Sequence, residues 1–270
     1  MGQRTHPTLA ISKRIVKRIV KMFLFSKRFV IYSVVLLCSL ILNGVLFYAA
    51  KKFYTDFKIT TVFPTHENFY SSRNAQLPEK TQKRVVLFGD SRILQWKNLP
   101  QIEGFEFVNR GIGGETTAQL RARFEPDVVA LDPDIVILQL GMNDLIAIGL
   151  QPKREKEIVL QCRDNLSFFV ETLLQMKAID VIFLTIIPPT QPSLARLPVW
   201  SDHIPQRVSD INQEWLSLAA TAKFHIVDTA KILKNESGKW HNNVNQDTLH
   251  LTPTGYQYLN QAVIAILKTL

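Results

Sequence analysis

One long stretch without a charged residue limits what this chain can become. It covers residues 29–50, 22 residues rich in Val, Leu, Ile and Phe, between the pairs Lys27-Arg28 and Lys51-Lys52. As an α-helix rising about 1.5 Å per residue, it would be roughly 33 Å long, enough to cross a hydrocarbon core of about 30 Å. We therefore expect a transmembrane anchor over residues 29–50.

Two other interpretations of this stretch are weaker. A core helix of a globular domain seldom stays apolar on every face over about six turns. A cleaved signal peptide needs small residues at positions −3 and −1 from the cleavage site. The small pair Ala49-Ala50 has Phe47 or Tyr48 two residues upstream. These observations favour an anchor that is retained.

The positive charge of the chain is concentrated at its N-terminus. Of the 32 Lys and Arg residues, ten lie in residues 1–52 with no Asp or Glu, so the other 218 residues carry 22 basic and 23 acidic side chains. A nearly neutral main part argues against a nucleic-acid-binding surface. Because eight basic residues precede the apolar stretch, the positive-inside rule predicts a single-pass protein with its N-terminus in the cytoplasm. The main part would then lie on the other side of the membrane, in the periplasm if the source is bacterial.

The basic segment 1–28 has a helical pattern of its own. Ile11, Ile15, Ile19 and Phe23 recur every four residues, and Lys and Arg fill most positions between them. This pattern is typical of an amphipathic helix lying on an anionic membrane surface. A tail that only directs topology fits the same residues equally well.

The remainder divides into a linker and one domain. Residues 51–82 mix aromatic residues with polar and turn-forming ones, and we expect a stalk there. In residues 83–270, short β-branched runs alternate with longer amphipathic ones, which predicts parallel strands joined by right-handed helical crossovers, an α/β fold. Strands are expected at residues 85–88, 105–109, 135–140, 181–187 and 225–227, and helices at residues 117–124, 154–176, 208–220 and 254–267.

Polar residues and glycines follow three of the expected strands. Gly89-Asp90-Ser91 follows the first strand, the glycine-rich turn at residues 110–117 follows the second, and Gly141-Met142-Asn143-Asp144 follows the third. Ligands of parallel sheets bind at the carboxyl ends of the strands. We expect these segments to share one edge of the sheet with Asp247-Thr248-Leu249-His250, which precedes the last helix.

A serine, an imidazole and a carboxylate are the groups that catalyse acyl transfer. An Asp three residues before a His can accept from Nδ1, which leaves Nε2 free to take the proton of Ser91. Each residue also has a simpler explanation, since Ser91 alone would be a helix cap, and so would Asn143-Asp144. Of the six histidines, His250 stands out by its partner Asp247. The coincidence of these groups at one edge favours catalysis.

The glycine-rich turn and Arg92, which lie next to the proposed catalytic residues, have other possible roles. The glycines of the 110–117 turn would suit a phosphate, but their spacing is not that of a dinucleotide site, and Glu115 would repel the ligand. Arg92, directly after the serine, would line the site or pair with a carboxylate at the surface, and we favour the surface pair. A Gly-x-Ser-x-Gly elbow of the α/β-hydrolases is absent from the sequence.

These four blocks, in this order, resemble the SGNH hydrolases, also called GDSL esterases and lipases, over residues 83–268. The resemblance implies a flavodoxin-like, three-layer α/β/α fold with a five-stranded parallel sheet. It implies Ser91 as nucleophile, His250 as general base and Asp247 as the group that orients the imidazole. It also implies an oxyanion hole formed by the backbone N–H groups of Ser91 and Gly114 and the side-chain amide of Asn143.

The favoured function is hydrolysis of a carboxylic ester through an acyl-serine intermediate. The ester would belong to an acylated glycan or to a lysolipid, and no cofactor or metal is expected. Alternatives are an O-acyltransferase that acylates an envelope sugar, a lysophospholipase-type lipolytic enzyme, and a non-enzymatic envelope protein that keeps the fold. A metallophosphoesterase would need more histidines beside Asp90 and Asn143. Cys38 lies in the apolar stretch and cannot pair with Cys162, so disulfides do not organise the fold.

The segment 188–200 is rich in proline and apolar residues and follows a predicted central strand. We expect it to lie over the site, where it would either shape the acyl or alcohol pocket or simply pack as a loop.

Overall fold

A computed structural model describes residues 8–62, 65–176, 178–218 and 221–270. The chain forms two compact units, Met1–Pro64 and Thr65–Leu270. Residues 1–7 of the expected basic tail, residues 63–64 of the expected stalk and residues 219–220 of an expected helix lie outside the described residues.

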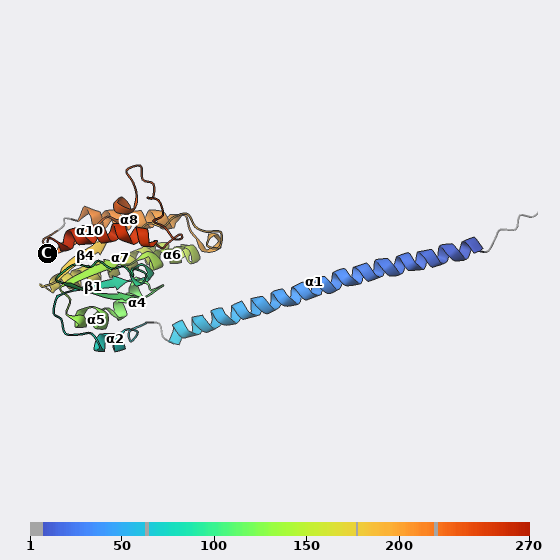
Figure 1. The fold of residues 1–270 in the computed structure, drawn as a ribbon, viewed down its shortest axis with the longest axis horizontal. Helices are drawn as coiled ribbons and strands as arrows, with labels where there is room; N and C mark the ends of the chain where they lie inside the picture. Colours follow the sequence, from blue (N-terminus) through green and yellow to red (C-terminus); the bar gives the residue numbers. More distant parts are fainter. Residues whose placement is uncertain (1–7, 63–64, 177, 219–220) are drawn as a thin grey trace, which may run out of the picture. The chain divides into compact units, whose positions relative to one another are not determined.

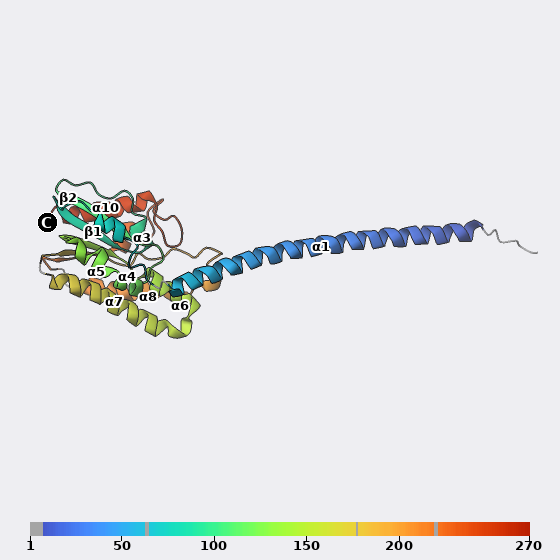
Figure 2. The ribbon, with the colours of Figure 1, turned by 90° about the horizontal axis from the view of Figure 1, so that it is seen from below.

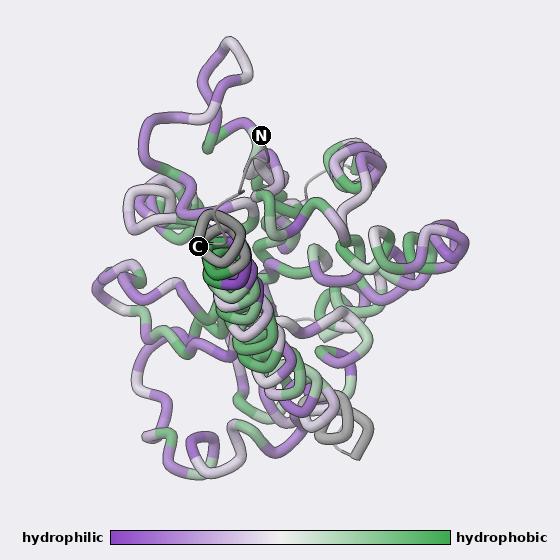
Figure 3. The backbone as a smooth tube through the Cα atoms, turned by 90° about the vertical axis from the view of Figure 1, so that its right-hand side faces the viewer, coloured by the Kyte–Doolittle hydropathy of each residue, from purple (hydrophilic) through white to green (hydrophobic). Residues whose placement is uncertain are grey.

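The first unit is a single helix, α1 (Thr8–Val62), 55 residues long (Figure 1). It contains the expected anchor together with parts of the expected tail and stalk, and it is continuous because no proline interrupts residues 8–62. Within it, Ile15–Thr55 is long and apolar enough to cross a membrane. Its apolar residues are green in Figure 3, and those described are exposed in the structure.

The second unit is built on a sheet of five parallel strands, as the sequence predicts. Its order is β2-β1-β3-β4-β5, so the chain reverses its direction of winding beside β1. Ligand sites of such sheets lie at the point where the strand order reverses, outside the carboxyl ends of the strands. The strands are β1 (Lys83–Gly89), β2 (Phe105–Gly111), β3 (Ile135–Gln139), β4 (Asp180–Leu184) and β5 (Phe224–Val227).

Helices cover both faces of the sheet, which gives the three-layer architecture. Successive side chains of a strand point to opposite faces. Thus Val86 and Phe88 enter the core beneath α4 to α8, whereas Val85 and Leu87 enter the core beneath α3, α9 and α10. Figure 2 shows α7 and α10 on opposite sides of the sheet. The helices are α2 (Ser71–Ala75), α3 (Ser91–Leu94), α4 (Thr117–Ala122), α5 (Phe124–Asp127), α6 (Met142–Leu150), α7 (Glu155–Gln175), α8 (His203–Ser217), α9 (Thr229–Leu233) and α10 (Pro253–Leu267), with 3₁₀ turns at Val129–Leu131, Pro152–Arg154 and Leu197–Val199.

Several elements differ from their expected bounds for identifiable reasons. The helix expected at residues 117–124 is two helices, α4 and α5, because Pro126 has no N–H to donate to the carbonyl of Ala122. The strand expected at residues 181–187 ends at Leu184, and beyond it the side chain of Asn212 bonds both backbone groups of Ile186 at 2.8 Å. The helix α6 was not expected, and its N-cap Gly141 has φ 106°.

Residues 65–82 belong to the second unit, although the sequence predicts a stalk over residues 51–82. The Tyr70 side chain is only 2% exposed, and its hydroxyl donates to the carbonyl of Gly111 at 2.7 Å. The Asn74 amide donates to the carbonyl of Pro126 and to Asp127 Oδ1, both at 2.8 Å. These long-range partners cannot be read from a segment with the composition of a linker. The domain therefore begins before residue 83.

Candidate active site

Ser91 lies just beyond the carboxyl end of β1, the strand between β2 and β3. A Cβ on the preceding Gly89 would lie 2.0 Å from the carbonyl oxygen of Gln139, so a larger residue does not fit there. Asp90 has extended backbone and caps α3, with Oδ1 accepting from the N–H of Arg92 at 3.0 Å. The helix cap is thus Asp90, whereas Ser91, considered above as a cap, lies in the first turn of the helix.

The structure brings Ser91, His250 and Asp247 into one hydrogen-bonded chain. Ser91 Oγ lies 3.0 Å from His250 Nε2, and His250 Nδ1 lies 2.8 Å from Asp247 Oδ2. The other carboxylate oxygen of Asp247 accepts from the backbone N–H groups of Leu249 at 2.7 Å and His250 at 2.9 Å. The short loop thus folds back on itself as the three-residue spacing predicts.

These hydrogen bonds determine the charge of Asp247. Partial burial raises the pKa of its carboxyl, but hydrogen bonds from the His250 side chain and from the N–H groups of Leu249 and His250 outweigh burial and lower the pKa to about 2. Asp247 is therefore ionised at neutral pH. An ionised carboxylate only accepts, so Nδ1 carries the proton that it shares with Asp247, and in the neutral ring Nε2 faces Ser91 as an acceptor.

The glycine-rich turn passes close to the serine. A Cβ on Gly113 would lie 3.8 Å from the Cβ of Ser91. Gly114 has φ 80°, a backbone conformation that favours glycine. Within the described part of the chain, neither the N–H of Ser91 nor that of Gly114 donates to a protein acceptor. Both amides are therefore available to a bound oxygen.

Asn143 lies in the first turn of α6 and is tied to the same turn. Its Nδ2 donates to the carbonyl of Glu115 at 2.9 Å, which uses one of its two N–H groups. The next residue, Asp144, accepts from the Thr117 N–H at 2.9 Å and from the Thr117 hydroxyl at 2.6 Å. Burial raises the pKa of Asp144 to about 6, although the hydrogen bonds from Thr117 lower it. The Asp144–Thr117 pair fixes α6 against the glycine-rich turn.

A buried cluster of charged side chains lies against the glycine-rich turn. It was not predicted from the sequence. Glu115 is 1% exposed and accepts from Arg123 Nε at 2.6 Å and lies 2.9 Å from His66 Nδ1. Arg123 also pairs with Asp127 at 2.9 Å and donates to the carbonyl of Gly89 at 3.2 Å. Glu115 is thus the partner of a buried arginine. The sequence signal was an acidic residue in the turn and Arg123 eight residues later, between α4 and α5, because buried charges need partners.

Arg92 does not form the surface pair that the sequence analysis favoured. Its side chain is 2% exposed, and Nε donates to the carbonyl of Leu249 at 2.8 Å. Its own carbonyl accepts from the Tyr256 hydroxyl at 2.7 Å. The arginine therefore ties the helix that carries Ser91 to the loop that carries His250 and to α10. A partner on a distant backbone leaves no local sequence signal.

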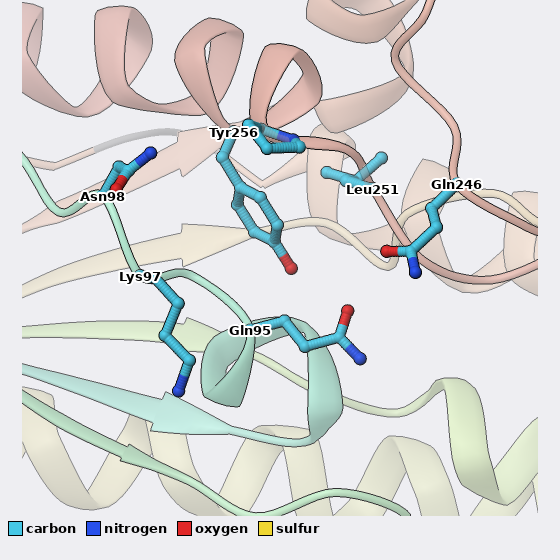
Figure 4. A pocket seen from close by; sticks show the side chains of 7 residues that line it. Gln95, Lys97, Asn98, Gln246, Leu251 and Tyr256 are labelled. Carbon is cyan, nitrogen blue, oxygen red and sulfur yellow. The ribbon is translucent and has the colours of Figure 1, made fainter.

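A pocket of about 250 Å³ is lined among others by Gln95, Gln246, Leu251 and Tyr256. The N–H of Gln95 donates to the carbonyl of Ser91, and the N–H of Gln246 donates to the carbonyl of His250, both at 2.9 Å. Figure 4 shows the side chains of Gln95 and Gln246 extending toward each other from different segments. Among the described residues, no group of three or more His, Cys, Asp or Glu is placed to hold a metal ion.

Comparison with known proteins gives a family match over most of the second unit. The model of the GDSL-like lipase/acylhydrolase family matches residues 75–258. An uncharacterized lipoprotein of Bacillus subtilis, YqeF, is 31% identical over 121 residues, and the match covers 38% of this chain and 48% of that protein. An acetylxylan esterase of Geobacillus stearothermophilus is 48% identical over 42 residues, 16% of this chain and 19% of that protein. This chain thus spans about half or less of the curated relatives it matches.

The fold has solved counterparts as well. The crystal structure of a proposed acylhydrolase of Bacteroides fragilis has a TM-score of 0.59 and 29% sequence identity, and the match covers 74% of this chain and 95% of that chain. The resemblance inferred from the four sequence blocks is confirmed by the family match, which includes all four. The chain belongs to the GDSL-like lipase/acylhydrolase family.

Proposed function

We propose that the protein is a serine esterase that hydrolyses a carboxylic ester with Ser91, His250 and Asp247 as its catalytic triad. The observation that carries the proposal is the unbroken chain of contacts from Ser91 Oγ to His250 at 3.0 Å and from His250 to Asp247 at 2.8 Å. Both distances are within hydrogen-bond reach, as a nucleophile, its base and the group that orients the base require.

In the first step, Ser91 Oγ attacks the ester carbonyl carbon while His250 Nε2 takes the hydroxyl proton. The C–O bond to the alcohol then breaks, and the same proton passes from Nε2 to the leaving oxygen. In the second step, water attacks the acyl-serine, His250 takes a proton from the water, and the carboxylic acid leaves as the proton returns to Ser91. Asp247 remains ionised throughout and stabilises the imidazolium that forms in each step.

The negative oxygen of each tetrahedral intermediate is held by three donors in this proposal. They are the backbone N–H groups of Ser91 and Gly114 and the second N–H of Asn143. Two observations support the assignment. The two backbone amides donate to no other described acceptor, and Asn143 is held in place through the carbonyl of Glu115 at 2.9 Å. Donors fixed before the reaction cost no reorganisation when charge develops.

We also propose that α1 anchors the chain, with the N-terminus in the cytoplasm and the catalytic unit on the other side of the membrane. The support is the apolar segment Ile15–Thr55 and the basic residues concentrated before residue 29. Within this proposal residues 1–28 contact the inner surface, and the ester is that of an acylated glycan or a lipid of the envelope.

A covalent probe tests the catalytic proposal. The full chain in detergent should react with a fluorophosphonate and hydrolyse p-nitrophenyl acetate without added metal. Ser91→Ala should lose both properties, because no other side chain replaces the nucleophile. The matched control is Ser71→Ala, an exposed serine of α2, which should behave like the native chain. Activity that survives in Ser91→Ala would contradict the proposal.

A further inference from the structure

A second pocket, of about 640 Å³, lies beyond the carboxyl end of β4 and has no role in the mechanism above. Its walls are Trp200 and Trp240, its polar groups are Thr190, Gln191 and Asp202, and prolines complete the lining. This volume is within the range of roughly 300–1,000 Å³ that is usual for small-molecule sites. It is also larger than the pocket of about 250 Å³ beside Gln95.

The pocket wall is hydrogen-bonded directly to the loop that carries Asp247 and His250. The N–H of Thr190 donates to the carbonyl of Thr248 at 2.9 Å, and its hydroxyl donates to the carbonyl of Asp247 at 3.3 Å. In return, the Thr248 hydroxyl donates to the carbonyl of Gln191 at 3.2 Å. A ligand in this pocket therefore lies beside the segment that positions His250.

The two indoles are held by different layers of the domain. Trp200 packs against the core beneath α8, and Trp240 packs against the core beneath α10. Trp240 forms a backbone bridge with Lys234, whose ammonium lies 5.0 Å from the centre of the indole ring. Trp200 follows the turn Leu197–Val199, which lies so close to α6 that a Cβ on Gly149 would be 2.1 Å from the carbonyl oxygen of Val199.

Both indoles also keep an unused donor. In the described part of the chain, neither Trp200 Nε1 nor Trp240 Nε1 takes part in a hydrogen bond, whereas Trp96 Nε1 donates to Asn260 at 2.8 Å. Both tryptophans are only partly buried, and neither Nε1 is among the buried polar atoms that lack a partner, so these N–H groups are accessible to a ligand. Two fixed aromatic surfaces with free donors at their edges suit a ligand that has apolar faces and a rim of hydroxyl groups.

The charges around the pocket indicate whether its ligand is anionic or neutral. The lining contains the carboxylate of Asp202 and has neither Lys nor Arg, although phosphate groups are usually held by such cations. Asp202 also stands at the N-terminus of α8, where a negative charge occupies the position that would otherwise attract an anion. The Lys234 ammonium lies against the Trp240 indole and is not part of the lining. A phosphate group is therefore disfavoured in the pocket, and a neutral polyhydroxylated ligand is favoured.

We propose that this pocket binds the uncharged glycan part of the substrate, with Trp200 and Trp240 against sugar faces and Thr190, Gln191 and Asp202 bonding hydroxyl groups. The inference rests on the proposed esterase function and names its substrate class. Sugar bound here would place an O-linked acyl group toward Ser91, across the loop that contains Asp247 and His250.

A binding experiment tests the pocket independently of catalysis. The full chain in detergent is titrated with xylotetraose and with N-acetylchitotetraose, neutral glycans without a scissile ester, and tryptophan fluorescence is followed. We expect at least one of them to change the fluorescence saturably. Trp240→Ala should weaken that binding by about fivefold, since a stacked aromatic contact contributes on the order of 1 kcal/mol and 1.4 kcal/mol is tenfold. Trp240→Phe should recover part of it.

The matched control is Leu194→Ala, on the loop that carries Trp200 but 86% exposed and outside the pocket lining. It should bind like the native chain. Failure of both glycans to bind at millimolar concentration, or equal binding by native and Trp240→Ala chains that give the same thermal unfolding curve, would overturn the inference. Neither result bears on the labelling of Ser91 by the fluorophosphonate, so the two proposals fail separately.

A substrate comparison provides the second measurement. We expect the ratio of kcat/KM for O-acetylated xylo-oligosaccharide to kcat/KM for p-nitrophenyl acetate to fall about fivefold in Trp240→Ala. The small ester gives the reference because it lacks the glycan. A ratio that does not change, or a selective loss of lysophosphatidylcholine hydrolysis instead, would identify the pocket as something other than a glycan site.

Discussion

At the scale of single residues, Asp247 determines which nitrogen of His250 faces Ser91. Its carboxylate accepts three hydrogen bonds, and its pKa is about 2. In Asp247→Asn the amide can donate to Nδ1 and so favour the wrong tautomer. We expect kcat for p-nitrophenyl acetate to fall on the order of 10³- to 10⁴-fold. Asp210→Asn, a change on the outer side of α8, should leave kcat unchanged. A loss smaller than tenfold in Asp247→Asn would exclude Asp247 as the orienting group.

Asn143 gives a second prediction at this scale. Removal of a single side-chain donor to an oxyanion typically slows turnover by about 10² to 10³. Asn143→Ala should therefore reduce kcat by that factor, while fluorophosphonate labelling of Ser91 stays detectable because the triad is intact. Steady-state kinetics and the rate of labelling measure the two effects, with Asn68→Ala at an exposed asparagine as the control. A kcat within threefold of the native value would remove Asn143 from the oxyanion hole.

At the scale of elements, the contact between α4 and α6 depends on pH through Asp144. Burial raises its pKa from the usual 3.8 to about 6 in the folded chain. The folded state therefore binds a proton more tightly than the unfolded state does. The resulting contribution to stability is fully present below about pH 4 and is lost as the pH rises through about 6. A shift of about two units corresponds to roughly 3 kcal/mol.

We expect this dependence to disappear in Asp144→Asn. The free energy of unfolding of the native chain, measured relative to that of the variant, should fall by up to about 3 kcal/mol between pH 4 and pH 7. Urea unfolding followed by tryptophan fluorescence gives both values, because the buried Trp96 and Trp215 report on the two cores. If the difference between the two chains is the same at pH 4 and pH 7, Asp144 is not the titrating group.

At the scale of the whole molecule, the boundary between the helical unit and the catalytic unit is set by Tyr70 and Asn74. A chain that starts at Thr65 keeps their contacts with Gly111, Pro126 and Asp127, whereas a chain that starts at Lys83 loses them. Deletion of a large buried side chain lowers the free energy of unfolding by about 3–5 kcal/mol. Each kcal/mol lost lowers Tm by roughly 2–4 °C in a domain of this size. The shorter chain should therefore melt roughly 10 °C lower.

Circular dichroism melting of the two fragments measures the difference. We expect the full chain to sediment with membranes and the fragment from Thr65 to remain in solution, since the apolar residues of α1 are then absent. Equal melting temperatures for the two fragments would show that residues 65–82 form a stalk after all.

The sequence by itself determined the features that depend on local pattern. The apolar stretch, the strands that alternate with helices and the position of Ser91 directly after a strand are all encoded within short windows. The rules for parallel sheets then bring the strand ends to one edge. The spacing of Asp247 and His250 was equally readable, because their hydrogen bond closes within one short loop.

Only the tertiary structure decided which distant groups meet. Arg92 is buried against the carbonyl of Leu249, Glu115 pairs with Arg123, and Tyr70 bonds the carbonyl of Gly111. The pocket between Trp200 and Trp240 likewise forms from loops that follow different strands. A side chain whose partner is a remote backbone carbonyl or a second loop has no periodicity to reveal it, because the contact exists only after the chain has folded.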